Sequence, residues 1–138
     1  MVLMEFYEHL LVSSVIGVPA SLYFGTGALN SIIIASCSII SGAFIDLDHF
    51  VISRVIDGNW GRLRKAFNHP LETLTNNEGI FGEKWLPPSK VIPSHITIAS
   101  SLGLFYLFTD ILAIGVASIS AFVHVAMDLI FLKYKQYI

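Results

Sequence analysis

Two short motifs place carboxylates beside imidazoles in stretches that are otherwise apolar. Asp46-Leu47-Asp48-His49 follows the nearly uncharged run 29–45, and His124-Val-Ala-Met-Asp128 lies inside another apolar run. The i, i+4 spacing of the second motif puts its two end residues on one stripe of a helix. Acidic groups inside such segments generally have a partner or a function. Because a cation can satisfy carboxylates and neutral imidazoles together, the two motifs predict walls of a metal site.

The other histidines of the chain extend this set of candidate ligands. The predicted ligands are His9, Asp46, Asp48, His49, His69, His95, His124 and Asp128. Imidazole with carboxylate suits Zn²⁺, Mn²⁺ or Fe²⁺ better than Ca²⁺, which prefers oxygen ligands alone. The set is larger than one tetrahedral ion requires. It therefore predicts one or two divalent transition-metal ions, with a bridging aspartate where there are two.

Each of these residues also has an explanation without a metal. His9, beside two glutamates, could be an interfacial histidine, and His69, before a proline, could be an exposed loop residue. His95 could cap the start of its helix. Either aspartate of the first motif could form an ion pair with Arg62 or Arg64. The metal prediction therefore depends on whether the fold brings the whole set together.

The composition is that of a membrane protein. Of the 138 residues, 54% are hydrophobic and 13% are charged, whereas soluble domains carry about 25% charged residues. The length fits one domain, residues 1–138. A net charge of −2 argues against nucleic acid as a partner. The single cysteine, Cys37, cannot form an internal disulfide and is interpreted as small apolar filler.

Four apolar runs approach the length of about 20 helical residues that a bilayer requires. They are residues 6–24, 28–45, 93–108 and 111–132. The joins at 25–27 and 109–110 are short enough only for hairpin turns, so neighbouring helices run antiparallel. We therefore predict an all-α, polytopic membrane protein, built as a four-helix transmembrane bundle in the lipid bilayer.

A polar loop, residues 51–92, separates the second and third runs. From Val51 to Phe67 its apolar residues recur at near-helical spacing between basic ones, with interruptions at Gly58 and Gly61. This pattern predicts an amphipathic helix in the membrane interface or, alternatively, an ordinary surface helix of the loop. The Gly, Pro and Asn content of residues 76–90 predicts an irregular stretch.

The basic residues set the expected orientation in the membrane. All eight lie in the polar loop or the C-terminal tail: Arg54, Arg62, Arg64, Lys65, Lys84, Lys90, Lys133 and Lys135. By the positive-inside rule, the loop and both termini face the cytoplasm, as in an integral protein of the plasma (inner) membrane. Because the two hairpin turns lie on the other side, the candidate ligands are expected to converge at the cytoplasmic ends of the helices.

These motifs resemble those of a known family, the membrane-bound metal-dependent hydrolases of bacteria and archaea, sometimes described as SOS-regulated inner-membrane proteins. Glu8-His9-Leu10-Leu11 is similar to the Gly-His-Leu-Leu of its first helix. Ile45-Asp46-Leu47-Asp48-His49 is similar to its Pro-Asp-x-Asp-His motif, with isoleucine in place of proline. The segment from His124 to Asp128 matches its His-x3-Asp motif.

One family segment, His-Arg-x3-His-Ser, is divided in this chain. Its first half resembles residues 66–69, with Pro70 in place of the arginine, and its second half resembles residues 94–97. The division makes residues 81–94 an insertion that could act as a substrate lid. The resemblance covers nearly the whole chain and implies a hydrolase whose metal site is built from these residues.

The residues and the resemblance together favour a metal-dependent hydrolase. A cation held by such ligands polarises a scissile bond and acidifies water, and Asp48 or Asp128 would act as the general base. A site at headgroup level favours a phosphoester or other ester in an amphiphilic substrate, such as a phospholipid or isoprenoid phosphate. The residues expected to hold its anionic head are Arg54, Arg62, Arg64 and Lys65.

Two other functions stay open at this point. One is a transition-metal transporter or sensor, against which stands the crowding of candidate ligands at one face, with only Asp110 near the far turn. The other is a structural membrane protein whose metal ties helix ends together without turnover. The oligomeric state is not predicted by the sequence.

Overall fold

A computed structural model describes residues 6–75 and 88–135, and these residues form helices and short turns without a strand. The elements are α1 (Phe6–Phe24), α2 (Ala28–Phe44), the 3₁₀ turn η1 (Ile45–Leu47), α3 (Asp48–Asp57), α4 (Gly61–Asn68), α5 (Pro70–Thr75), α7 (Pro88–Thr109) and α8 (Leu112–Lys135). The prediction of an all-α chain is confirmed.

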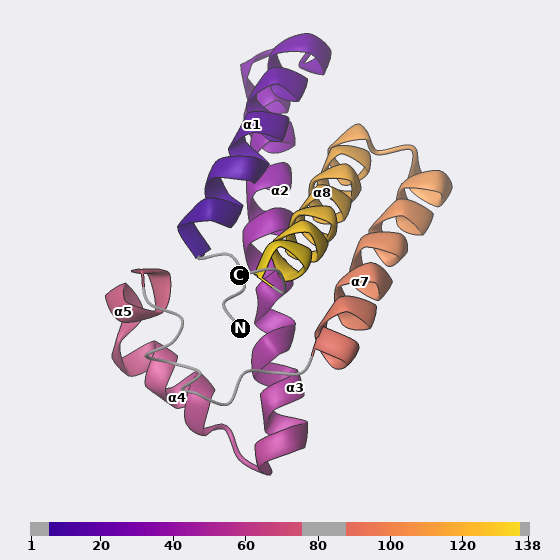
Figure 1. The fold of residues 1–138 in the computed structure, drawn as a ribbon. Helices are drawn as coiled ribbons and strands as arrows, with labels where there is room; N and C mark the ends of the chain where they lie inside the picture. The colour runs from indigo at the N-terminus through magenta and orange to yellow at the C-terminus, as the bar shows by residue number, and fades with distance from the viewer. Residues whose placement is uncertain (1–5, 76–87, 136–138) are drawn as a thin grey trace.

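The long helices form two antiparallel hairpins, α1 with α2 and α7 with α8 (Figure 1). Helix α8 packs against both α2 and α7 and also contacts α1. Both short connections lie at the upper end of the view, while α3, α4 and α5 lie at the lower end. The start of α1, the end of α2, the start of α7 and the end of α8 therefore lie toward the same end of the molecule.

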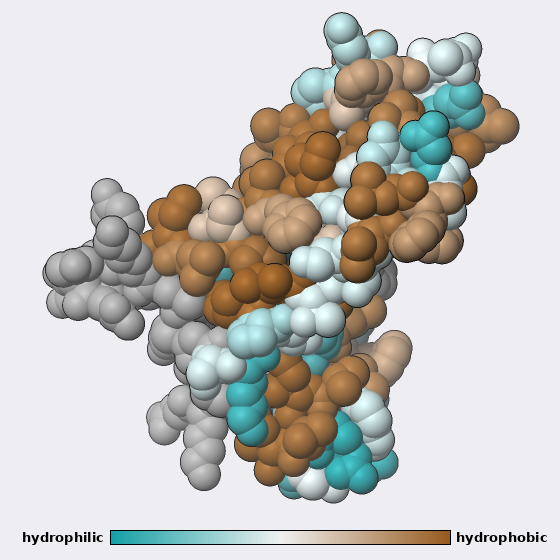
Figure 2. Space-filling model, turned by 90° about the vertical axis from the view of Figure 1, so that its right-hand side faces the viewer, coloured by the Kyte–Doolittle hydropathy of each residue, from teal (hydrophilic) through white to brown (hydrophobic). Residues whose placement is uncertain are grey.

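Three helical segments are long and apolar enough to cross a membrane: Ala28–Asp57, Ser89–Thr109 and Leu112–Ile130. Glu8–Phe24 is a shorter apolar helix. Outward-facing side chains on these helices are large and apolar; Leu107 and Phe108, for example, are 75% and 87% exposed. Figure 2, in which α7 faces the viewer, shows a mainly hydrophobic surface over the middle, with hydrophilic residues toward both ends. Such a surface suits a hydrocarbon medium.

The second long helix does not end at the first motif, as the predicted span 28–45 implied. It continues through the 3₁₀ turn η1 into α3 and ends only at Asp57. Gly58, with φ of 74°, then adopts the left-handed conformation that commonly terminates a helix, and its N–H donates to the carbonyl of Arg54. The helix continues because the motif's charged groups meet partners on neighbouring helices and have no need to reach water.

The polar loop is accordingly shorter than residues 51–92. The amphipathic pattern from Val51 to Phe67 is two helices, α3 and α4, separated at Gly58–Trp60. Buried Phe50, Ala66 and Val91 form a small core that joins α3, α4 and the start of α7. The irregular stretch and the lid proposed from the sequence lie largely in residues 76–87, outside the described residues, whereas residues 88–94 are helical.

Helix α7 begins at Pro88, five residues before the predicted start of the third span. Proline is favoured in the first turn of a helix, where its missing N–H would have no partner. Val91 is fully buried, so packing fixes this first part of α7. Pro93 is consequently inside the helix, and His95 lies about two turns from the helix start. His95 therefore does not cap α7.

Small side chains bring the helices together along their upper length. The hydroxyls of Ser38 and Ser41 on α2 donate to the carbonyls of Ser13 on α1 (3.1 Å) and Ala117 on α8 (2.9 Å). Ser118 on α8 donates to the carbonyl of Ala99 on α7 at 3.0 Å. Small residues and hydroxyl groups are the common means of helix association inside a membrane.

Candidate metal centre

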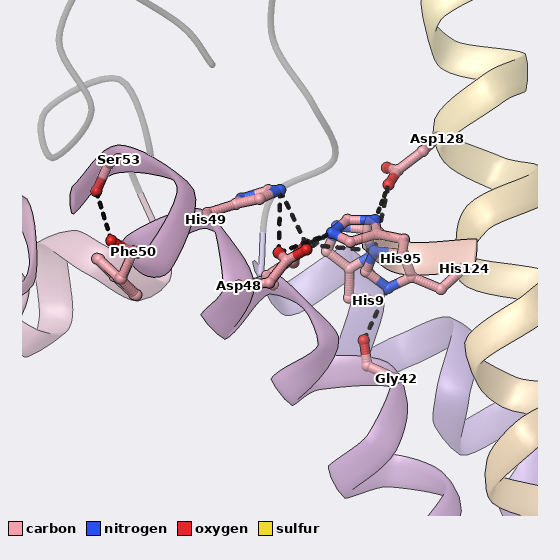
Figure 3. Close-up of polar contacts among 10 residues, drawn as sticks. His9, Gly42, Asp48, His49, Phe50, Ser53, His95, His124 and Asp128 are labelled. Atoms are coloured by element: carbon pink, nitrogen blue, oxygen red, sulfur yellow. Dashed lines mark hydrogen bonds and ion pairs between the residues drawn. The ribbon is translucent and has the colours of Figure 1, made fainter. Parts of the chain in front are cut away.

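Asp46 lies at the centre of a group of imidazoles. Its Oδ2 is 3.3 Å from His9 Nε2 on α1, and its Oδ1 is 3.3 Å from His124 Nε2 on α8. The same Oδ1 is 3.7 Å from the Nε2 atoms of both His49 and His95. One carboxylate thus faces imidazoles from four helices, as a bridging ligand would. Figure 3 shows the side chains of His49, His95 and His124 pointing toward one another with those of Asp48 and Asp128.

Asp128 forms the opposite wall of the same group. Its Oδ2 is 3.3 Å from His95 Nδ1 and 3.3 Å from His124 Nε2. Asp128 and His95 have no measurable exposure, and His124 is 2% exposed. The rings of His9 and His124 stack with centroids 3.8 Å apart. We call the full group the cluster; its members are His9, Asp46, Asp48, His49, His95, His124 and Asp128.

The 3₁₀ turn η1 explains how the first motif contributes three side chains. In a regular α-helix, residues two apart point to nearly opposite sides. The tighter 3₁₀ turn over Ile45–Leu47 changes the winding between α2 and α3, and Asp46 and His49, three residues apart, lie on the same side. Asp48 also reaches the cluster, where its Oδ1 lies 3.1 Å from His95 Nε2. Leu47, between the two aspartates, is 48% exposed and points away.

The backbone of α2 fixes the orientation of one imidazole. His124 Nδ1 lies 2.8 Å from the carbonyl oxygen of Gly42. Because a carbonyl can only accept, Nδ1 carries the proton of this hydrogen bond. In the neutral ring, Nε2 then presents a lone pair to the carboxylates of Asp46 and Asp128. A histidine held by a carbonyl in this way is the usual arrangement of a metal ligand.

The cluster is rich in polar atoms that lack hydrogen bonds. Among the described residues, the buried atoms without a hydrogen-bond partner include Asp46 Oδ1, His124 Nε2, both carboxylate oxygens of Asp128 and both ring nitrogens of His9. Unpaired buried groups of this kind are costly, and several together indicate an ion or other ligand. The donor set, imidazole nitrogen with carboxylate oxygen, fits zinc, manganese or iron.

Three combinations of atoms in the described part of the chain could each hold an ion. They are His9–His124–Asp128, Asp46–His95–His124 and Asp48–His49–His95, each with its ligand atoms within 4.8 Å of one another. Consecutive combinations share His124 or His95. The arrangement therefore offers ligands for one ion at the centre or for two neighbouring ions, as in two-metal sites.

The eighth predicted ligand, His69, lies apart from these combinations. It follows α4, its side chain is 57% exposed, and its Nδ1 is 3.8 Å from Glu72 Oε2. No metal-capable combination among the described residues includes it. The structure thus brings together seven of the eight candidate ligands.

The basic residues predicted to hold an anionic head differ in their surroundings. Arg62 Nε is 2.8 Å from Asp57 Oδ2, and the guanidinium of Arg54 lies 5.9 Å from the ring centroid of Trp60. Arg64 and Lys65 are exposed on α4. Asp46 and Asp48 both pair with histidines. The alternative in which these aspartates form a clamp with arginines is therefore not the arrangement observed.

Two features of the centre have no signature in the sequence. The first is the carbonyl of Gly42, because any residue type supplies a carbonyl and only the packing of α2 on α8 aims this one at His124. The second is the 3₁₀ turn, whose sequence resembles an ordinary helical continuation. A hint of the first exists in retrospect, since glycine inside an apolar helix often marks a close approach.

Comparisons with known proteins do not extend this description. No protein-family model, no curated protein and no solved structure matches the chain significantly. The chemistry of the centre is therefore argued from its own residues.

Proposed function

We propose that this chain is a metal-dependent hydrolase of the membrane that acts on a phosphoester or other ester bond of an amphiphilic substrate. In this proposal α1, α2, α7 and α8 form a four-helix transmembrane bundle. The distribution of basic residues supports an orientation with the cluster and both termini on the cytoplasmic side. The motif resemblance to membrane-bound metal-dependent hydrolases supports the same assignment.

The single observation that carries the proposal is the gathering of three carboxylates and four imidazoles in the cluster, where several buried atoms have no hydrogen bond within the described residues. Asp46, Asp48 and Asp128 have histidines as partners and no lysine or arginine among the described residues. Three carboxylates among four imidazoles, on helices apolar enough to cross a membrane, form a donor set that suits a cation between them. Divalent cations would balance the carboxylates and also satisfy the nitrogens and oxygens that lack hydrogen bonds.

The cluster residues divide into ligands and a general base. The ligand atoms would come from His9, Asp46, His95, His124 and Asp128. When bound, the cation supplies Lewis acidity that polarises the scissile bond and acidifies a water. Asp48 suits the role of general base better than Asp128, because its side chain keeps 10% exposure whereas that of Asp128 has 1%. A base must reach both the water it deprotonates and the solvent that receives the proton.

An amphiphilic substrate has an anionic head and an apolar part, and basic side chains of the protein would hold the head. Helix α4, which carries Arg64 and Lys65, packs on α3, and α3 carries His49. Exposed basic side chains near the headgroup level attract anionic heads. Arg64 and Lys65 are exposed on α4, whereas the side chain of Arg62 is 14% exposed, so Arg64 and Lys65 are the first choices for this role.

Hydrolysis can be tested with the purified full chain. Elemental analysis should find Zn, Mn or Fe, and the metal-loaded protein should release phosphate or a headgroup from a panel of phospholipids and isoprenoid phosphates. Asp46→Asn, which keeps the side-chain volume, should lose both bound metal and turnover. Asp110→Asn is the matched control: Asp110 is exposed at the far turn with φ of 53°, a conformation that asparagine tolerates. Metal-loaded wild type that is inert on the whole panel would contradict the proposal.

A structural role for the metal is the second candidate. It is favoured by the origin of the ligand atoms, since His9, Asp46, His95 and His124 come from four different segments and the three histidines are buried. A cation there would tie four helix ends together. The two candidates separate at Asp48→Asn. The hydrolase requires this variant to keep its metal and thermal stability while losing turnover, whereas a structural centre has no turnover to lose.

A further inference from the structure

An apolar groove lies between α2 and α7, with α8 as its floor. Its volume is about 370 Å³, and its walls include Cys37, Ile45, Ile98, Leu102 and Ile114. This volume lies within the range of about 300–1,000 Å³ that is typical of ligand sites. Ser41, the one hydroxyl in the lining, already donates to the carbonyl of Ala117. The groove therefore offers its occupant apolar contacts only.

One end of the groove lies against the cluster. Ile45 directly precedes Asp46, and Ile98 lies one turn after His95 on the same side of α7. From Ile45 the groove continues toward the short turns as far as Cys37 and Ile114. The eight-residue step from Cys37 to Ile45 corresponds to roughly 12 Å of helix length. The groove thus runs lengthwise along the helices from the ligand-bearing end.

We propose that this groove holds a hydrocarbon chain of the substrate while the head of the same molecule lies at the cluster. The inference deepens the proposed function and rests on it. The walls of the groove belong to helices that are apolar enough to cross a membrane, so the medium that reaches the groove is hydrocarbon. A polar occupant would have no partner there. The substrate class that fits both parts is a chain-bearing lipid with an anionic phosphoester head.

Photolabelling tests this placement without turnover. The probe is a long-chain alkylphosphonate, which resists hydrolysis, with a diazirine in mid-chain, added to Mn²⁺-loaded full chain in phosphatidylcholine vesicles. Mass spectrometry of the labelled peptides should place the adducts at Ile98, Leu102 and Ile114. Leu104 and Ile119, which are 57% and 56% exposed on the outer faces of the same helices, should be labelled much less. Equal labelling of both sets would overturn the proposal.

A second probe separates the substrate from bulk lipid. The long-chain alcohol with the same diazirine lacks the anionic head. It should label the groove weakly, and Asp46→Asn should reduce labelling by the phosphonate to the level given by the alcohol. If the alcohol labels the groove as strongly as the phosphonate, then the groove takes up any bilayer chain and is not a substrate subsite.

Filling the groove should change the preference for chain length. In a series of alkylphosphonates in vesicles, affinity should rise with chain length until the groove is full, by less than the roughly fourfold gain per methylene for transfer from water, because the chain enters from hydrocarbon and gains packing contacts only. Leu102→Trp should end this rise at a shorter chain, and Leu102→Ala should end it at a longer one. Leu104→Trp places the same bulk on the outer face of α7 and should leave the end point unchanged. If the rise in affinity ends at the same chain length in wild type and in all three variants, the inference is contradicted.

These outcomes are distinct from those that test hydrolysis. Turnover of amphiphilic esters with no dependence on Leu102 would leave the hydrolase standing and remove the groove as a subsite. Phosphonate-dependent labelling of the groove without turnover on any substrate would keep the groove as a lipid-binding site and contradict the hydrolase. The protein would then bind a lipid at the metal centre without cleaving it.

Discussion

The half of the long helices that carries the cluster and the half that leads to the short turns pack through different side chains. Toward the turns, hydroxyl groups donate directly to carbonyls on neighbouring helices, as Ser31 does to Ser21 at 3.1 Å. Gly17 permits a close approach, since a Cβ there would lie 2.7 Å from Ser38 Cβ. At the cluster, the neighbours are ionisable, larger and incompletely hydrogen-bonded within the described residues.

The difference indicates which half finds its polar partners within the described chain and which half would gain them from a bound ion. In the turn half, the side-chain donors just described have acceptors on the facing helix, so the described chain supplies both sides of each contact. In the cluster half, carboxylates and imidazole nitrogens face one another, and several of these buried atoms have no hydrogen bond within the described residues. We therefore expect the stability of the cluster half to depend on a bound cation and that of the turn half to be independent of it.

Chelation should show the largest effect. Anything that binds only the folded state stabilises it by about 4 kcal/mol at a thousandfold excess over Kd. Removing the metal from the full chain should therefore accelerate amide exchange by about a thousandfold where opening exposes the cluster. Hydrogen exchange followed by mass spectrometry should locate the loss in peptides around Asp46 and His124, with little change around Ser21 and Ser31.

The same experiment contains its own control. Asp46→Asn should already exchange like the chelated wild type and should not respond further to chelator, whereas Asp110→Asn should respond as wild type does. Uniform acceleration along all the long helices would mean that the two halves unfold as one unit, and the proposed independence of the turn half would then be wrong.

The convergence of ligands was predictable because it depends on chain topology. Two joins of two or three residues force antiparallel hairpins, and any helix ends on the side opposite the turns must then meet. His9, Asp46, His95 and His124 are therefore expected at one end of the molecule, and the packing of α8 on α1 and α2 brings them into contact. The apolar composition predicted membrane-crossing helices, and three segments satisfy that criterion in the described residues.

The details of the centre were not predictable because they depend on tertiary contacts. The charge of Asp46 and Asp48 suggested the end of a span. Both aspartates pair with histidines of other helices, however, and the helical segment that begins at Ala28 continues to Asp57. Pro93 suggested a helix start, but burial of Val91 begins α7 five residues earlier. His69 was indistinguishable from the other histidines by residue type, and only its exposed position after α4 separates it from them.

A substitution in the turn half should destabilise the protein by a similar amount with and without metal. Gly17→Ala places a methyl group against Ser38, and overpacking of this kind costs about 1–3 kcal/mol. Thermal unfolding of the full chain should show the loss both in metal-loaded and in chelated protein. Gly27→Ala is the control, because a Cβ at Gly27 meets nothing within 4 Å. If the loss at Gly17 disappears on chelation, the halves are coupled.

The smallest expected effect comes from one hydroxyl between α7 and α8. Ser118→Ala removes the donor to the carbonyl of Ala99 and leaves the volume almost unchanged. Hydrogen bonds between helices in a membrane contribute on average about 0.6 kcal/mol, so the free energy of unfolding should fall by an amount of that order and metal affinity should stay constant. Ser101→Ala, whose exposed hydroxyl bonds only to Thr97 of its own helix, should be close to neutral. A loss of metal affinity in Ser118→Ala would show that the contact between α7 and α8 positions His95 against Asp128, because these two residues face each other across the two helices.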